Sequence, residues 1–571
     1  MRVDQLAGLV SGGPPERARA PTRSGGQILV DQLERHGVEL IFGVPGESYL
    51  AVLDALHDSP IRFVNARHEA GAANMAEAYG KLTGRPGVCF VTRGPGATHG
   101  SIGVHTAYAD STPMLYLVGQ VPRGELGREA LQEVDLVAMF APLAKWAEQI
   151  IEAERIPEVV RRAFQTATSG RPGPVVLSLP EDLLAQQSAV ADAPAYRAVL
   201  AAPASGELAG VRERLARATR PLLLIGGGGW SAETARRAQA FAEASGLAVV
   251  CCFRCQDYLD SRSSSYAGHL TTSTDPALAR RVREADVLLV VGDRLGDVTT
   301  AGYTLIASPT PEQALIHVYP QALEIGRVFT AELALVSDSA AFFAAIEPVD
   351  GSAWAAGTAQ AHVDYLAWSV PPAGSWRLDL ALVMAQAAQR LAGEAIVVSD
   401  AGNFGAWVSR FLPFHFYRSQ LMPESGAMGY GVPAAVAAKL LNPDRPVVCF
   451  VGDGGFQMSG LELATAAQEG LAIVVVVVNN EMYGTIRMHQ ERAYPGRVVG
   501  TGLRNPDFAA LARACGADGQ AVERTEQFMP AFERALAARG PALIELRVDG
   551  EAISPTETIS SIRAGGAVPV R

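Results

Sequence analysis

Short, strongly apolar runs alternate along this chain with longer stretches in which alanine and other helix-forming residues recur at helical spacing. The runs are rich in Val, Ile and Leu and are apolar at nearly every position, so a strand formed from them is buried on both faces. Such strands belong to parallel sheets that helices cover on both sides. The pattern predicts doubly wound α/β domains with these strands: Leu40–Val44, Ile61–Val64, Gly87–Thr92, Met114–Val118, Pro221–Ile225, Ala248–Cys252, Val287–Val291, Ala314–Val318, Ala395–Ser399, Val447–Val451, Ile473–Val478 and Ala542–Leu546.

The predicted elements fall into three groups, separated by two stretches that we interpret as linkers. Gln187–Gly206 is rich in Ala and Pro, and Val349–Ser375 is rich in Ala, Gly, Pro and Trp. A chain of 571 residues is also too long for one hydrophobic core. We therefore expect three parallel-sheet domains, at residues 25–190, 205–350 and 376–563, after a disordered tail at residues 1–24.

The amino-acid composition and the net charge limit the classes of molecule that this protein binds. The chain is 49% hydrophobic and 19% charged, which excludes a mostly unstructured protein. Lys+Arg 48 against Asp+Glu 59 gives a net charge of −11, without a clustered basic stripe. This balance argues against nucleic acid or an anionic membrane as the main partner.

Hydropathy and cysteine content indicate the compartment. The longest uninterrupted apolar stretch, Leu471–Val478, is far shorter than the roughly 18 residues that span a bilayer. Six cysteines in so long a chain do not form a disulfide framework. We therefore expect a cytoplasmic protein that has no membrane partner.

Polar residues follow two of the apolar strands in the third segment. Gly452-Asp453-Gly454 ends one strand and Asn479-Asn480 ends another, with 480 − 453 = 27 residues from Asp453 to Asn480. That spacing suits strand–helix–strand, which places a carboxylate and an amide oxygen side by side at the sheet edge. Mg²⁺ favours such oxygens beside phosphate and water. Gly454 and Gly455 allow backbone N–H groups to approach a diphosphate at the start of the next helix.

With these motifs the chain resembles thiamine diphosphate (ThDP)-dependent enzymes of the acetolactate synthase-like group. The resemblance runs from about Gly25 to Arg563 and implies a pyrimidine-binding, a central and a diphosphate-binding domain, in that order. It implies Asp453 and Asn480 as side-chain ligands of Mg²⁺, and the backbone carbonyl of Met482 as a third ligand. In the family, an active site is built from two subunits, so the resemblance also implies a homodimer or a homotetramer.

A second motif that carries the resemblance contains a glutamate of the first segment. Glu69 lies in Arg67-His68-Glu69-Ala70-Gly71, just after a predicted strand. In the family this glutamate hydrogen-bonds the aminopyrimidine ring, where a carboxyl shielded from water shares a proton with a ring nitrogen. Taken alone, Glu69 is better explained as a glutamate in the first turn of a helix, where the helix dipole favours it. The resemblance implies the catalytic role, with His68 as a structural neighbour.

Further matching segments supply cofactor and substrate contacts. In Ser425–Pro433, the resemblance implies that Gly426 offers a carbonyl to the aminopyrimidine and that Met428 supports the bent cofactor, which holds reacting groups in contact. Gln120 matches a glutamine that faces the substrate. The residues that it implies for the diphosphate are Gly402, Asn403, Gly452, Gly454 and Gly455.

The chain departs from acetolactate synthases around the substrate. Val298 stands where the family has an arginine that grips the acceptor carboxylate, and a valine makes no such bidentate contact. His489 stands where the biosynthetic enzymes have a tryptophan. Glu47 replaces a small residue and adds a carboxylate near the cofactor. These changes favour a donor or acceptor different from that of acetolactate synthesis.

The residues do not decide whether the protein binds a second cofactor, FAD. The run Gly226–Gly229 follows a predicted strand and resembles the glycines that touch FAD in the biosynthetic synthases. It is equally well explained as a sharp strand-to-helix turn. A further stretch associated with FAD in the family is replaced here by Tyr266–Thr271.

Together these features predict a ThDP- and Mg²⁺-dependent carboligase or decarboxylase that acts on a small 2-oxo acid. One alternative is a ThDP-dependent lyase or hydrolase that cleaves an acyloin or a diketone. The other is a non-catalytic ThDP-binding protein. Because Glu69, the metal ligands and Met428 are all present, the sequence favours an enzyme.

Overall fold

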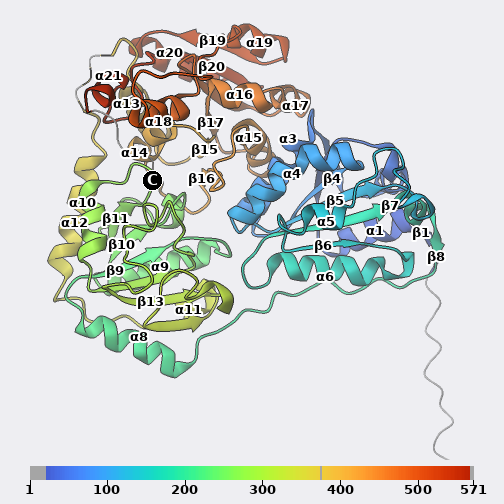
Figure 1. Cartoon of the computed structure of the whole chain (residues 1–571), viewed down its shortest axis with the longest axis horizontal. Coiled ribbons are helices and arrows are strands. Elements are labelled where there is room, and N and C mark those ends of the chain that lie inside the picture. Colours follow the sequence, from blue (N-terminus) through green and yellow to red (C-terminus); the bar gives the residue numbers. More distant parts are fainter. Residues whose placement is uncertain (1–20, 373, 375, 566–571) are drawn as a thin grey trace, which may run out of the picture.

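A computed structural model describes residues 21–372, 374 and 376–565. It contains three α/β domains, each built on one six-stranded sheet (Figure 1). All strand pairs within these three sheets are parallel, and helices connect successive strands. The predicted fold class is therefore confirmed. Residues 1–24 were predicted to be a disordered tail. Of these, residues 1–20 lie outside the described residues.

The N-terminal domain has the sheet order β3-β2-β4-β5-β7-β6. Its strands are β2 (Leu40–Gly43), β3 (Arg62–Asn65), β4 (Gly87–Val91), β5 (Met114–Gln120), β6 (Trp146–Gln149) and β7 (Pro174–Pro180). Its helices are α1 (Gly25–Arg35), α2 (Leu50–His57), α3 (Glu69–Thr83), α4 (Gly94–Ala109), α5 (Leu136–Phe140), α6 (Ile156–Thr168) and α7 (Glu181–Ala185).

The central domain has the sheet order β11-β10-β9-β12-β13-β14. Its strands are β9 (Pro221–Ile225), β10 (Ala248–Cys251), β11 (Tyr266–His269), β12 (Val287–Val291), β13 (Ala314–Tyr319) and β14 (Leu333–Val336). Its helices are α8 (Ser205–Arg217), α9 (Ala232–Ala244), α10 (Pro276–Glu284), α11 (Ser339–Ala345) and α12 (Ala355–Trp368).

The C-terminal domain has the sheet order β16-β15-β17-β18-β20-β19. Its strands are β15 (Ile396–Ser399), β16 (Gln420–Leu421), β17 (Val447–Gly452), β18 (Ile473–Asn479), β19 (Asp518–Val522) and β20 (Ala542–Arg547). Its helices are α13 (Leu380–Leu391), α14 (Gly405–Phe411), α15 (Gly431–Leu441), α16 (Asp453–Ser459), α17 (Glu462–Gln468), α18 (Gly484–Ala493), α19 (Phe508–Ala514), α20 (Thr525–Leu536) and α21 (Ile559–Ala564).

The segments between the domains are more structured than their composition indicates. Helix α12 lies within Val349–Ser375 and runs along the outer side of the central domain (Figure 1). It buries Ala361 and Tyr365, and the Tyr365 ring packs against Tyr266 of β11 at 4.7 Å. The linker prediction is therefore wrong for α12, because alanine is also the strongest helix former and one buried face suffices to dock the helix.

The expected tail and first linker also contribute a small sheet. β1 (Arg23–Ser24) pairs antiparallel with β8 (Gln187–Ser188), so ordered structure begins before residue 25. The Arg23 guanidinium contacts Asp31 and donates to the Val190 carbonyl. The prediction of disorder is wrong for these last tail residues, because their backbone finds a partner strand.

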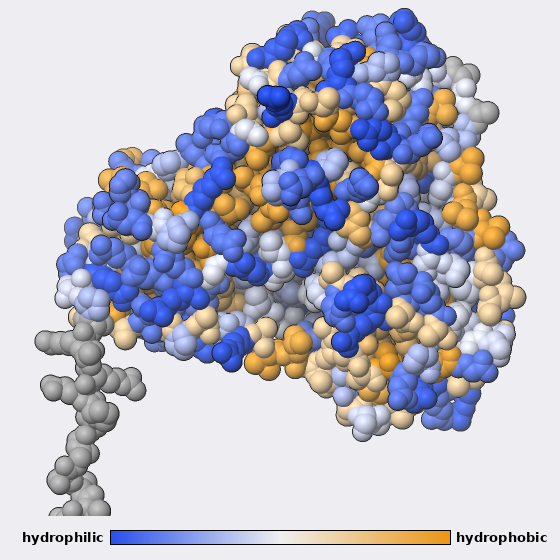
Figure 2. Space-filling view, turned by 180° about the vertical axis from the view of Figure 1, so that it is seen from behind, coloured by the Kyte–Doolittle hydropathy of each residue, from blue (hydrophilic) through white to orange (hydrophobic). Residues whose placement is uncertain are grey.

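The N- and C-terminal domains share a core through α3 and α15. Tyr430 at the start of α15 donates its hydroxyl to the buried Glu77 carboxylate of α3 at 2.7 Å. A side chain at Gly71 of α3 would overlap Glu462 of α17. The space-filling view shows polar and apolar side chains intermixed over the surface, and a hollow where the three domains meet (Figure 2). No helix among the described residues is long and apolar enough to cross a membrane.

Candidate functional site

The predicted metal ligands lie at the carboxyl edge of the C-terminal sheet. Strands β17 and β18 are paired neighbours, and they end at Gly452 and Asn479. Asp453, Asn480 and Met482 therefore leave the same edge of the sheet. Just after Asn480, the backbone turns through a positive φ of 56° at Glu481.

The Asp453 carboxylate suits a cation. It is buried and accepts hydrogen bonds from the Gly454 N–H at 2.9 Å and from the Asn505 side-chain amide at 2.7 Å. Across residues 21–372, 374 and 376–565, no Lys, Arg or His pairs with it. Burial raises the pKa of Asp453. A buried carboxylate with only neutral partners is stabilised by a bound cation, and carboxylate and amide oxygens are ligands that Mg²⁺ prefers.

The cofactor-loop residues lie beside these ligands. The Met428 side chain reaches Gly454, and a side chain at Gly454 would also overlap the Tyr483 ring. Gly426 has a φ of 69°, and the space beside its Cα is open, so its backbone is accessible to a ligand. These small residues leave room for a group at the sheet edge, so the residues present fit a bound diphosphate cofactor.

Asn403 and Gly402 follow β15, the neighbouring strand of β17. Asn403 donates to the Ile553 carbonyl at 2.7 Å and lies next to Gly484, as does the Asn480 side chain. The predicted residues of the third segment are thus gathered around one edge: Gly402, Asn403, Gly426, Met428, Gly452, Asp453, Gly454, Gly455, Asn480 and Met482.

Asp400, which the sequence analysis did not select, fixes the loop that carries Met428. Its carboxylate is buried and accepts the N–H groups of Gly429 at 3.0 Å and Gly431 at 2.9 Å. Burial raises its pKa to about 6. Its position directly after β15 was the available signal, since a polar residue that ends a buried strand lies at the ligand-binding edge.

Glu69 begins α3 at the carboxyl edge of the N-terminal sheet. Its carboxylate contacts the His99 Nδ1 at 3.0 Å, and one of its oxygens lies near Gly96 in the first turn of α4. The His99 and His68 rings stack at 4.8 Å. The His68 Nδ1 accepts the Ala70 N–H, so this histidine caps α3.

Gln120 ends β5 at the same edge but points into the protein. Its side-chain amide donates to the Val134 carbonyl at 2.8 Å, and its oxygen accepts the Val121 N–H at 2.9 Å. The side chain is buried. In this conformation both polar ends of Gln120 are occupied by backbone groups.

An ion-pair network that the sequence analysis missed extends along this edge. Arg93 follows β4 and is 7% exposed. Its guanidinium donates to Glu47, which follows β2, at 3.1 Å and to Glu181, which follows β7. The Arg93 Nε is buried and has no partner among the described residues. Arg93 and Glu181 could have been found in the sequence, because both directly follow apolar strands.

The residues that depart from the acetolactate synthase pattern lie in different places. Val298 is half-buried in the loop after β12, and His489 is exposed on α18. Arg294, which lies in the same loop, donates to the Ala109 carbonyl at 2.9 Å and so joins the central domain to the N-terminal domain.

Close packing explains the glycine run of the central domain. A side chain at Gly226 would overlap Cys252, one at Gly227 would overlap the Gly292 carbonyl, and one at Gly228 would overlap the Ser111 carbonyl. The run therefore lets β9 approach β12 and the N-terminal domain. These contacts account for the glycines without a flavin.

The C-terminal helix α21 covers the segment that holds Met482. Ile553, Ile559 and Ile562 form a cluster on which Met482 packs. The helix is anchored by Glu491 of α18, a buried carboxylate that accepts two hydrogen bonds from Arg563, at 2.8 and 2.7 Å. The C-terminal segment thus supports one side of the predicted metal site.

Weakening the Glu491 anchor should loosen α21. The hydrogen bonds from Arg563 are the main cause that lowers the pKa of Glu491 to about 2. A carboxyl with a lowered folded pKa stabilises the folded state above its ordinary pKa, and this contribution disappears as the pH falls toward 2. We expect Glu491→Gln to accelerate amide hydrogen exchange in α21 at pH 7, by about tenfold.

The same measurement across pH provides the control. The difference between Glu491→Gln and the native protein should narrow as the pH falls from about 4.5 toward 2, because the carboxyl then gains a proton more readily in the opened state than in the folded state. Glu533 of α20 forms an exposed ion pair with Arg390 of α13. Glu533→Gln removes this pair and should leave hydrogen exchange in α21 unchanged. Equal exchange in the native protein and Glu491→Gln at pH 7 would contradict this anchoring role.

Comparisons with known proteins match all three domains. The N-terminal TPP binding domain, the central domain and the C-terminal TPP binding domain of thiamine pyrophosphate enzymes match residues 23–139, 208–346 and 400–546. Both cofactor-binding domains are thus present, which confirms the ThDP prediction.

Several curated relatives align over most of the chain. The acetolactate synthase isozyme 2 large subunit of Escherichia coli (strain K12) is 31% identical, over 92% of this chain and 96% of its own. The acetolactate synthase large subunit of Corynebacterium glutamicum is 32% identical, over 91% and 86%. The probable acetolactate synthase large subunit of Methanocaldococcus jannaschii is 30% identical, over 95% and 94%. The chain belongs to the thiamine pyrophosphate enzymes, as a carboligase or decarboxylase of the acetolactate synthase type.

Proposed function

We propose that this enzyme uses ThDP and Mg²⁺ to join the acyl part of a pyruvate-type 2-oxo acid to a neutral carbonyl acceptor. When bound, ThDP supplies the carbon nucleophile and accepts the electron pair that remains when carbon dioxide leaves. The observation that carries the choice of acceptor is the network of Glu47, Arg93 and Glu181.

The cofactor is assigned to residues of both outer domains. Asp453, Asn480 and the Met482 carbonyl hold Mg²⁺, while Gly402, Asn403, Gly452, Gly454 and Gly455 approach the diphosphate. The Gly426 carbonyl would accept a hydrogen bond from the aminopyrimidine amine, and the Met428 side chain would support the cofactor. These assignments rest on the family pattern and on the gathering of these residues at one sheet edge.

Glu69 is assigned the proton transfer. With ThDP bound, the Glu69 carboxyl would hold a proton at a ring nitrogen of the aminopyrimidine, and the cofactor would supply the basic amine. The motif supports this role, as does the position of Glu69 at the sheet edge, where its carboxylate contacts His99 of α4. Gln120 is assigned to the substrate, to which its amide turns only if it leaves the Val134 carbonyl.

The charge of the network disfavours a second 2-oxo acid as acceptor. One guanidinium faces two carboxylates, so the three side chains carry 1 − 2 = −1. An approaching carboxylate is repelled by this charge, and Val298 offers no guanidinium to grip it. An aldehyde or other neutral carbonyl has no such penalty.

A product screen tests the donor and the acceptor. Protein loaded with Mg²⁺ and ThDP would be given pyruvate, with either an aldehyde or a second 2-oxo acid as acceptor. Carbon dioxide release and ligated products would be measured separately. We expect ligation to the aldehyde; ligation mainly to the second 2-oxo acid would reject the proposed acceptor.

Removing one carboxylate should shift the acceptor preference. In Glu181→Gln the network becomes neutral, so we expect the ratio of kcat/KM for 2-oxo acid acceptors to that for aldehyde acceptors to rise about tenfold. Glu158→Gln, an exposed glutamate of α6, serves as the matched control with an unchanged ratio. An unchanged ratio in Glu181→Gln would remove the network from the specificity argument.

The network is equally compatible with cleavage of a neutral acyloin or diketone. Formation and cleavage of the carbon–carbon bond use the same groups. A neutral substrate of either reaction lies beside the same negatively charged network. Supplying acyloins and diketones in the product screen, and measuring aldehyde or acid release, separates this second candidate from ligation.

We further propose that the enzyme is a cytoplasmic homodimer or homotetramer. Six cysteines that form no disulfide support a reducing compartment. The family pattern, in which Glu69 and the Asp453 edge of different subunits meet, supports an oligomer. Mixing of two inactive variants, described in the Discussion, tests the shared site.

A further inference from the structure

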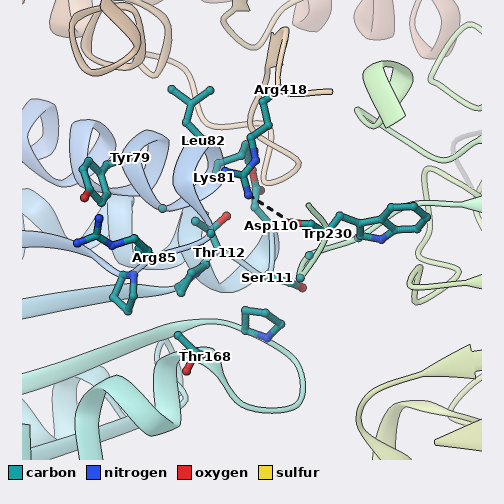
Figure 3. A pocket seen from close by; sticks show the side chains of 18 of the residues that line it. Tyr79, Lys81, Leu82, Arg85, Asp110, Ser111, Thr112, Thr168, Trp230 and Arg418 are labelled. Atoms are coloured by element: carbon teal, nitrogen blue, oxygen red, sulfur yellow. Dashed lines mark hydrogen bonds and ion pairs between the residues drawn. The ribbon is translucent and has the colours of Figure 1, made fainter. Parts of the chain in front are cut away.

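A cavity of about 380 Å³ lies where the three domains meet (Figure 3). It is lined by the C-terminal half of α3, the segment Asp110–Pro113, the turn Gly227–Trp230, the loop after β10 and the segment Tyr417–Leu421. Its volume falls within the range of small-molecule binding sites. Nothing in the proposed reaction uses it.

The cavity is separate from the predicted catalytic edge. Glu69, Gln120 and Asp453 are not among its lining residues. Glu69 begins α3, whereas the cavity contacts α3 from Tyr79 onward. At 1.5 Å per residue, the ten residues between them span roughly 15 Å of helix.

The acidic groups of the lining already have partners. Asp110 contacts Lys81 and accepts the Glu424 N–H at 2.8 Å. Asp257 accepts the Ser419 N–H at 3.0 Å, and Asp338 accepts the Ala201 N–H. These carboxylates are therefore committed to lysine and to backbone groups.

Glu424 is the remaining acid beside the cavity. Burial, together with the charges of Asp110 and Asp293, raises the pKa of Glu424 to about 8. Among the described residues, the Glu424 carboxyl forms no ion pair with a lysine or an arginine. It therefore does not pair directly with a nearby arginine.

Arg254 is such an arginine. It lies in the loop after β10 with a φ of 60°, and its guanidinium lies over the Phe253 ring, 4.8 Å from the centroid. Its Nη1 is buried without a hydrogen-bond partner, and Arg254 forms no ion pair with any described residue. Arg254 is half-buried, and a guanidinium with a buried, unpaired nitrogen is stabilised when an anion pairs with it.

Arg418 brings a second guanidinium to the same cavity. It also has a left-handed backbone, with a φ of 67°, and its Nη2 donates to the Trp230 carbonyl at 3.3 Å. Its Nε is buried and has no partner in the described parts of the chain. The Arg418 guanidinium lies beside the backbone of Trp230, and the Trp230 ring points away from it (Figure 3).

We propose that this cavity binds a small-molecule anion, a carboxylate or a phosphate monoester, which pairs with Arg254 and is assisted by Arg418. The planar guanidinium with an uncommitted Nη1 is suited to such groups. The proposal concerns a site additional to the catalytic one, and it does not depend on the identity of the acceptor.

The same residues connect the cavity to the loop that carries Gly426 and Met428. Lys81 donates to the Met422 carbonyl at 2.9 Å, and Asp110 accepts the N–H groups of Glu424 and Ser425. An anion at Arg254 therefore acts next to the segment that holds the cofactor loop in place.

Binding can be measured without turnover. The full-length protein, loaded with ThDP and Mg²⁺ so that the diphosphate site is filled, would be titrated with oxamate, inorganic phosphate and AMP. Oxamate is a non-reacting carboxylate, so these arms separate a carboxylate ligand from a phosphate ligand. We expect at least one probe to raise Tm and to bind in calorimetry.

Substitution of Arg254 should abolish this binding selectively. We expect Arg254→Gln to raise the dissociation constant of the probe at least tenfold. The protein should stay folded, because the substitution removes a half-buried charge that has no ion-pair partner among the described residues. Arg262→Gln, an exposed arginine of the same domain paired with Asp260, should bind as the native protein does.

Three outcomes would overturn the proposal. In the first, none of the probes binds the loaded native protein at millimolar concentration. In the second, Arg254→Gln binds the probe as tightly as the native protein does. In the third, the purified protein releases flavin on denaturation, which shows that a dinucleotide occupies the region. Because the readout is binding, a failure here is distinguishable from a failure of the proposed carboligase activity.

Discussion

Glu69→Gln should lower kcat by about 10²- to 10⁴-fold, the usual contribution of a positioned acid or base. Glutamine keeps the size and hydrogen-bonding reach of the side chain but carries no exchangeable carboxyl proton. The substitution should leave ThDP affinity and the melting temperature nearly unchanged, since His99 is the only side chain among the described residues with which the Glu69 carboxylate pairs. Steady-state kinetics and calorimetric ThDP titration measure both quantities.

His99 provides the matched control. His99→Asn removes the other partner of the Glu69–His99 pair and leaves the carboxyl in place. We expect it to reduce kcat by less than about tenfold. If Glu69→Gln retained full turnover, or if both variants lost activity equally, Glu69 would not be the group that exchanges the proton.

Much of the fold was predictable because strands buried on both faces leave a strong signal. Pro221–Ile225 and Val287–Val291 were predicted to the residue, since each is an unbroken apolar run. β7 was missed because its run begins and ends with proline. β16 and β19 are, respectively, two residues long and partly polar, so no periodicity marks them.

The packing of α12 shows why composition alone was insufficient. Its sequence is rich in alanine and contains a glycine, which is typical of both linkers and helices. The helix forms because a surface is available for Ala361 and Tyr365. β11 supplies that surface, and its Tyr266 precedes Tyr365 by 365 − 266 = 99 positions. Such tertiary contacts are not readable from a local window.

The site residues could be predicted where they belong to one local motif. They could not be predicted where they come from strands that are distant in the sequence. Asp453 and Asn480 follow adjacent strands of one segment, so their spacing was informative. Glu47, Arg93 and Glu181 follow three strands far apart in the sequence. Their ion pairs appear only once the sheet order places β2, β4 and β7 along one edge.

Asp453→Ala should have the second large effect, on cofactor binding. We expect the affinity for Mg²⁺ and ThDP to fall at least about a hundredfold, because the buried carboxylate is the only charged side chain among the three assigned ligands. Without cofactor, the variant should be as stable as the native protein or more so, because a buried carboxylate with no cationic partner is lost. Melting curves with and without Mg²⁺ and ThDP measure both effects.

Asn505→Ala is the control for Asp453→Ala. The Asn505 amide donates to both the Asp453 carboxylate and the Asn479 side chain, at 2.7 Å each, so it orients a ligand without being one. We expect a loss of roughly tenfold in affinity. A full cofactor-induced rise in Tm in Asp453→Ala would remove this residue from the metal site.

Mixing the two inactive variants shows whether subunits share a site. If Glu69 of one subunit serves the Asp453 edge of another, a dimer of Glu69→Gln with Asp453→Ala contains one intact site and one doubly altered site. Random exchange makes half of the dimers mixed, so activity should recover to about a quarter of the native value. If both functions lie within one subunit, every site contains one defect and mixing restores nothing. Recovery therefore requires that each catalytic site be built from two chains, and its absence would place Glu69 and Asp453 of the same chain in one site.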